Sequence, residues 1–131
     1  MADYIATTDI RDKILATEVV SADITDSTSF FNDFVISKGL ETTDIDIPVH
    51  FRIADMLIYY VQMRMSEERI GIQSNISIRS DGQPVDLYEE KYKRYKKEFE
   101  DRQDGITNEM ITGDADTPEE YASGQVRIYR G

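Results

Sequence analysis

The sequence predicts a mainly α-helical domain: a small bundle of three to four helices with a short β-strand or hairpin excursion and an extended C-terminal arm. Three observations predict this fold class. Apolar residues recur at helical spacing in several stretches before residue 102. A period of two interrupts that pattern between Ile72 and Ile78, where Ile72, Ser74, Ile76 and Ile78 alternate with more polar residues. Helical spacing is then lost after Arg102, until a second alternating segment follows at Val126 to Tyr129.

Two helices are predicted before residue 40. The stretch "TTDIRDKILA" has an apolar edge at helical spacing, and Thr8 or Asp9 is the expected N-cap, because its side-chain oxygen accepts a first-turn N–H. The stretch "SADITDSTSFFNDFVISKGL" predicts a longer helix with acidic residues at its front, where the helix dipole is positive. Gly39 is expected to end this helix, since glycine readily adopts positive φ. The residues "LETTDIDIP" then form an extended link.

The central helix is predicted over "PVHFRIADMLIYYVQMRMSEERIG". Pro48 suits the first helical position, because its missing N–H has no partner to lose there. Apolar residues cover a wide arc of this helix, so we expect it to be the most buried element. Gly71 is its expected end.

A β segment should follow this helix. Ile72, Ile76 and Ile78 alternate with polar residues, and Asp81-Gly82 is a turn signal before Pro84. An isolated two-stranded ribbon is marginally stable in water. We therefore expect these isoleucines to form an inter-subunit β segment that leans on a neighbouring chain.

The last predicted helix carries both aromatic and basic residues. In "PVDLYEEKYKRYKKEFEDR" four aromatic residues fall at i, i+4, i+7 and i+11, which is typical of a buried face. Aromatic and basic side chains together can also bind single-stranded nucleic acid. The core interpretation is favoured, because acidic residues on the same helix offset the lysines.

Residues 1–101 are thus predicted to form a helical domain with the β excursion near 72–83, and residues 102–131 an acidic linker and extended arm. The arm ends in an alternating segment that has little to pair with nearby in the sequence. Strand addition to another protein's sheet would satisfy its backbone groups. The predicted partner-binding residues are Val126, Arg127, Ile128, Tyr129 and Arg130.

Composition restricts the classes of function. The net charge is −11, which disfavours general binding of DNA or anionic lipid. The chain has no cysteine, which excludes disulfides and thiolate metal sites. We expect neither a signal peptide, since "MADYIATTDIRDK" has no apolar core, nor a membrane span.

The residues also offer little for catalysis, so we predict no catalytic residue, metal or cofactor. His50 is the single histidine, and structural roles are commoner for such a residue. Acidic residues cluster at 44–46 and 114–120, but Pro118 occupies the fifth ligand position of a calcium loop and the later glycine is missing. A solvated acidic linker is the favoured interpretation.

The order of these parts resembles the head–tail connector, or head-completion adaptor, proteins of tailed bacteriophages. The run "IPVHFRIADMLIYYVQMR" is similar to that family's P-x₅-A-x₅-Y core helix, and "DLYEEKYKRYKKEFE" is similar to its D-x-Y-x-x-K-x-x-x-Y-x-x-x-L/F helix. The likeness covers residues 8–101, and the tail departs from the family pattern. The matching positions are Pro48, Ala54 and Tyr60 in the first motif, and Asp86, Tyr88, Lys91, Tyr95 and Phe99 in the second.

The resemblance implies a structural virion protein at the head–tail interface, made in the host cytoplasm. Such adaptors form a homo-oligomeric ring, usually dodecameric, below the portal protein. They extend the DNA channel without sequence-specific DNA binding and dock the stopper or tail-completion protein. Their C-terminal segments commonly reach the portal. The alternative is a non-viral helical interaction or regulatory module with a disordered partner-binding tail, and an enzyme or nucleic-acid binder ranks last.

Overall fold

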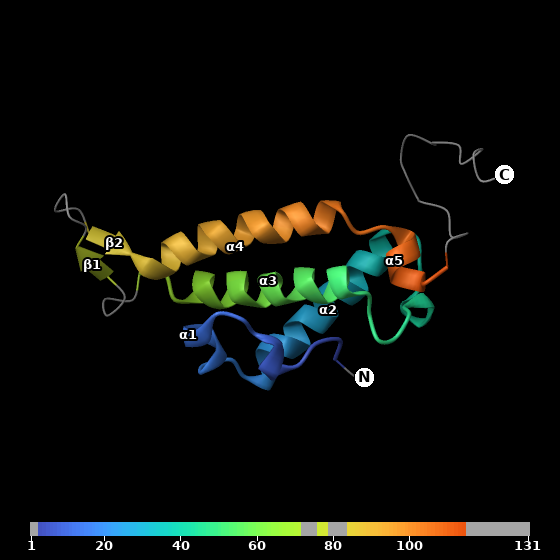
Figure 1. Cartoon of the computed structure of the whole chain (residues 1–131), viewed down its shortest axis with the longest axis horizontal. Helices are drawn as coiled ribbons and strands as arrows, with labels where there is room; N and C mark the ends of the chain where they lie inside the picture. Colours follow the sequence, from blue (N-terminus) through green and yellow to red (C-terminus); the bar gives the residue numbers. More distant parts are fainter. Residues whose placement is uncertain (1–2, 72–75, 79–83, 115–131) are drawn as a thin grey trace.

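A computed structural model describes residues 3–71, 76–78 and 84–114 of the chain. These residues form a bundle dominated by helices, as Figure 1 shows, and the prediction of a mainly helical fold is confirmed. The elements are η1 (Thr7–Asp9), α1 (Lys13–Ala16), α2 (Ser21–Ser37), η2 (Thr42–Asp44), α3 (Phe51–Glu68), β1 (Ile76–Ile78), β2 (Pro84–Asp86), α4 (Leu87–Asp104) and α5 (Asn108–Thr112).

The two longest helices, α3 and α4, lie side by side and antiparallel, and α2 crosses α3 at an angle (Figure 1). Helix α3 is the central element, as its apolar arc predicts, because it packs against both α2 and α4. Aromatic rings join the three helices: Phe30 of α2 stacks on Tyr60 of α3 at 4.4 Å, and Phe99 of α4 meets Phe30 edge-on at 5.3 Å. The fully buried α2 and α3 side chains include Phe31, Val35, Ile53, Met56, Leu57 and Val61.

The predicted aromatic face of α4 is largely buried. Tyr88, Tyr95 and Phe99 are all less than 9 % exposed, while Tyr92 is half-buried. Packing against α3 therefore explains this stripe, and the core interpretation of these rings is confirmed.

Helix α2 ends as the sequence predicts. Gly39 has φ of +83°. The Leu40 N–H donates to the Val35 carbonyl at 3.2 Å and the Gly39 N–H to the Ile36 carbonyl at 3.0 Å. This paired arrangement is the Schellman motif, which depends on a residue that tolerates the left-handed conformation.

The start of the chain differs from the single helix expected over residues 7–16. A 3₁₀ turn, η1, and the short α1 replace it, and Asp12 caps α1 in place of Thr8 or Asp9. Asp12 Oδ1 accepts the N–H groups of Ile14 and Leu15, both at 3.0 Å. Asp9 instead accepts the Ala6 N–H at 2.8 Å, which closes the 3₁₀ turn.

Helix α3 begins three residues later than expected. Phe51, rather than Pro48, is the first helical residue, and His50 caps the helix: its Nδ1 accepts the Arg52 N–H at 3.1 Å. Pro48 lies before the helix and follows a cis peptide bond with Ile47. The expected extended link before it also contains a 3₁₀ turn, η2.

The expectation of an extended linker from residue 102 is wrong for the part of it that the structure describes. Helix α4 continues to Asp104, and α5 follows at Asn108–Thr112. Ile106 and Ile111 are buried, and the Ile111 carbonyl accepts the Asp46 N–H at 2.8 Å. Residues 105–112 therefore belong to the packed body, although their sequence is polar.

Gly113 provides a test of this docking. Its φ is +72°, and an added Cβ would lie 2.7 Å from Asp46 Oδ2. Gly113→Ala should lower the free energy of unfolding by about 1–2 kcal/mol, because an L-residue is strained in the left-handed region. Urea denaturation measures this change.

Gly105→Ala is the matched control, since Gly105 has φ of −92° and its added Cβ would meet only the Arg102 carbonyl at 3.6 Å. This variant should be neutral or more stable by up to about 1 kcal/mol. Equal destabilisation by both variants would contradict the close approach at Gly113.

No helix in the described ranges has both the length and the apolar character needed to span a bilayer.

Candidate functional site

The structure describes only some of the predicted site residues. The predicted portal-binding residues Val126 to Arg130 and the predicted inter-subunit residue Ile72 lie outside the described ranges. Ile76 and Ile78 lie in β1, where they are in register with Asp86 and Pro84 of the antiparallel β2. Figure 1 places this β1–β2 ribbon at one end of the α3–α4 pair, and α5 near the other end.

Asp86 ties the base of the ribbon to both long helices. It closes β2 and caps α4, because its Oδ1 accepts the N–H groups of Tyr88 at 3.0 Å and Glu89 at 3.2 Å. Its Oδ2 accepts the N–H of Gly71, just after α3, at 2.5 Å. These hydrogen bonds, the one from Gly71 foremost, lower the pKa of Asp86. The carboxylate thus holds together the two points where the chain enters and leaves the β segment.

A second polar cluster fixes the N-terminal segment on α3. Gln62 is buried at 2 % exposure, and its Oε1 accepts the N–H groups of Arg11 and Asp12, both at 2.9 Å. Asp12 in turn accepts hydrogen bonds from Lys91 Nζ at 2.8 Å and from the Tyr95 hydroxyl. Burial raises the pKa of Asp12, but the hydrogen bonds from Lys91, Tyr95 and Leu15 outweigh it, so the net shift is downward.

A third cluster centres on Asp55 of α3. One carboxylate oxygen pairs with Arg11 and the other accepts from Arg102 Nε at 2.6 Å. Arg102 also bonds Glu98 Oε2 at 2.9 Å and lies over the ring of Tyr59, with its Cζ 4.3 Å from the ring centroid. Desolvation raises the pKa of Asp55, but the arginine contacts lower it further than burial raises it.

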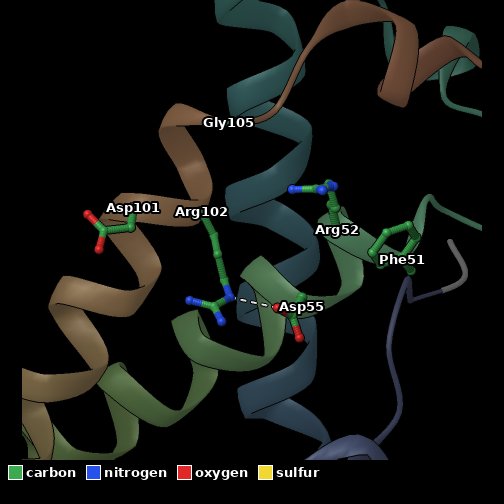
Figure 2. A pocket seen from close by; sticks show the side chains of 6 residues that line it. All are labelled: Phe51, Arg52, Asp55, Asp101, Arg102 and Gly105. Carbon is green, nitrogen blue, oxygen red and sulfur yellow. Dashed lines mark hydrogen bonds and ion pairs between the residues drawn. The ribbon is translucent and has the colours of Figure 1, made fainter.

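A hollow of about 310 Å³ opens beside this cluster, between the beginning of α3 and the end of α4. Figure 2 shows Arg52 reaching toward the hollow, Arg102 turned toward Asp55, and Asp101 directed outward. Phe51 lies at its edge with 71 % of its surface exposed. The hollow is lined by Phe51, Arg52, Asp55, Asp101, Arg102 and Gly105.

The histidine and carboxylate side chains of these clusters make structural contacts. His50 uses its Nδ1 to cap α3, and both Asp55 oxygens accept from arginine groups. Within residues 3–71, 76–78 and 84–114, no group of three or more histidine or carboxylate side chains is placed to hold a metal ion. What the hollow presents is an exposed aromatic ring beside a guanidinium group.

The lowered pKa values make stability depend on acid pH. Asp12 and Asp55 titrate lower in the folded chain than in the unfolded chain, where the aspartate pKa is about 3.9. The stability that they contribute is present above that value and is lost as pH falls through the lower folded pKa. We expect the urea midpoint to fall steeply below pH 4, and less steeply in Asp12→Asn.

Asp101→Asn serves as the control for this pH dependence. Its side chain is 60 % exposed, and among the described residues it pairs with the similarly exposed Lys97 alone. This variant should keep the parental pH profile. Identical profiles for all three proteins would show that the Asp12 contacts do not stabilise the charged carboxylate.

Sequence patterns did not point to Gln62, Asp55, Arg102 or Phe51. Of these four, Gln62 is the residue that the sequence could have singled out as a buried polar contact, because it is a polar residue on the buried arc of an otherwise apolar helix. Phe51 lies outside that arc, so its exposure could have been suspected. The pairing of Asp55 with Arg102 joins residues 47 positions apart, and no short-range spacing reveals it.

No protein-family model matches the chain, and no curated protein or solved structure matches it.

Proposed function

We propose that the protein is a structural assembly protein without catalytic activity: a head–tail adaptor that forms a ring below a phage portal, as its sequence resemblance implies. The β1–β2 ribbon is the observation that carries this proposal. Each strand has three residues, and among the described residues β1 pairs with β2 alone. The ribbon stands at one end of the helical bundle (Figure 1).

The ribbon supports assembly for a physical reason. A lone two-stranded ribbon gains little stability in water. Its outer edges present backbone groups that a strand of another chain can pair with. Asp86 fixes its base to α3 and α4, so contact with a neighbouring subunit would be transmitted to the helical body. A ring of identical subunits supplies such a neighbour to every copy.

The C-terminal arm would make the second contact. Val126 and Ile128 alternate with Arg127, which suits strand addition to the portal protein. The stopper or tail-completion protein would dock on another face of the ring. Because the chain carries a net charge of −11, the channel wall would repel DNA and let it pass without sequence-specific binding.

Electron microscopy with portal rings from the same phage genome tests the proposal. We expect rings of the protein to cap the portal. The double variant Val126→Asp, Ile128→Asp should lose co-sedimentation with the portal, whereas the control Ser123→Asp should keep it. One-to-one complexes with another partner, without rings, would instead support the regulatory interaction module.

A further inference from the structure

The beginning of α3 presents an exposed apolar and cationic surface. Phe51 is 71 % exposed and Ile47 is 65 % exposed. The Phe51 ring stacks on His50, with centroids 4.6 Å apart, and the Arg52 guanidinium carbon lies 5.5 Å from the Phe51 centroid. We call this group, residues 47 and 50–52, the Phe51 surface. An exposed aromatic ring flanked by a cation is suited to an aromatic or acidic peptide side chain.

The charges around this surface are unevenly matched. The two carboxylates of the adjoining hollow are already engaged, Asp55 by two arginines and Asp101 by Lys97 at 3.0 Å. Arg52 makes no ion pair with any carboxylate in the described ranges. An acidic segment would therefore find a cation there without first breaking an existing pair.

An acidic segment follows the last described residue of the chain. Gly113 and His50 line a second hollow, of about 390 Å³, so the described chain ends beside the Phe51 surface. The next residues read "ADTPEEY", with Glu119, Glu120 and Tyr121 five to seven positions beyond Asp114. Five extended residues span about 17 Å. Because the segment starts next to His50, this length is enough for Glu119 to reach the Phe51 surface.

We propose that the segment Glu119–Tyr121 docks on the Phe51 surface of its own subunit. Its carboxylates face Arg52, and the Tyr121 ring packs against Phe51. A short tether raises the effective concentration of the segment at the Phe51 surface to the order of millimolar. A weak contact therefore suffices to hold the segment there. The proposal is independent of the portal and ring: it concerns the isolated subunit, and it leaves Val126 to Arg130 beyond the docked residues.

Paramagnetic relaxation enhancement in the full chain tests the docking. The chain has no cysteine, so Ser123→Cys gives a single site for a spin label. We expect the amide signals of Phe51, Arg52 and Gly105 to lose at least half of their intensity, because even a partly occupied contact in fast exchange broadens amides close to the label, and a millimolar effective concentration half-occupies a site of millimolar affinity. Dilution should leave this loss unchanged, since the contact lies within one molecule.

Charge variants of the labelled chain identify the contact. Arg52→Glu should lower the ratio of docked to undocked molecules at least roughly two- to fivefold, the value of one exposed ion pair. Adding Glu119→Arg and Glu120→Arg to Arg52→Glu should restore the loss of signal. Lys93→Glu is the matched control, because Lys93 is 73 % exposed on α4, and it should change nothing.

Three results would overturn the proposal. The first is full signal intensity at Phe51 and Arg52 in the labelled parent. The second is a signal loss that disappears on dilution, which would assign the contact to a second copy. The third is an effect of Arg52→Glu on the signal loss that is no larger than the effect of Lys93→Glu. That result would mean that the segment is held only by non-specific electrostatic attraction.

Discussion

Replacing Leu15 by alanine is expected to lower the free energy of unfolding by about 2–5 kcal/mol, the range for a fully buried leucine. Leu15 is 0 % exposed although α1 has only four residues. So short a helix has little stability of its own. The loss would therefore report on contacts between the N-terminal segment and the bundle, measured by urea denaturation at neutral pH.

Ile14→Ala provides the control from the neighbouring position. Ile14 is 54 % exposed, yet it lies in the same helix and loses the same number of side-chain carbons. Its substitution should change the free energy of unfolding by no more than about 0.5 kcal/mol. Similar effects of the two variants would mean that α1 does not pack through Leu15.

Gln62→Leu should cost about 2–4 kcal/mol of the free energy of unfolding. The substitution introduces an apolar side chain of similar size and removes the oxygen that accepts the Arg11 and Asp12 N–H groups. A fully buried donor without a partner costs about 1–3 kcal/mol, and here two partly buried donors lose theirs. The added apolar contact of leucine offsets part of that cost.

Gln103→Leu, at the half-buried end of α4, is the corresponding control and should stay within about 0.5 kcal/mol of the parent. Hydrogen exchange adds a local test of the Gln62 variant. The Arg11 and Asp12 amides should lose protection before those of α4. Unchanged exchange at both amides would show that Gln62 does not hold the segment.

The three long helices could be predicted from sequence because each buries one face of many residues. The apolar arc of α3 and the aromatic stripe of α4 repeat over several turns, and such repetition is the strongest periodic signal. Gly39 marked the end of α2 for a local reason, its positive φ. These features depend on residues close together in the chain.

The short elements could not be predicted in the same way. Helix α5 has five residues, within a polar stretch that reads as a linker. It is held by tertiary contacts: Ile111 is fully buried, and its carbonyl pairs with Asp46, 65 positions earlier. Periodicity over five residues carries almost no information, so the sequence pattern places the start of the linker too early.

The candidate site could not be predicted either, because it depends on contacts between residues that are far apart in the sequence. The exposed Phe51 and the Asp55 cluster arise where α3 meets α4, so their environment depends on how two distant stretches pack. Sequence patterns can identify a buried face, but a residue outside that face can be solvated or can form a contact surface. Only the packed structure places Arg52 beside an open hollow.

The length of the α3–α4 pair has a consequence for any assembly that uses both of its ends. Each helix has 18 residues, which corresponds to about 27 Å of rise. The pair is thus a rigid spacer between the ribbon and the Phe51 surface. Lengthening both helices by whole turns would move the two ends apart with little change in their mutual orientation. Any other insertion would also rotate one end against the other, so the natural length fixes spacing and angle together.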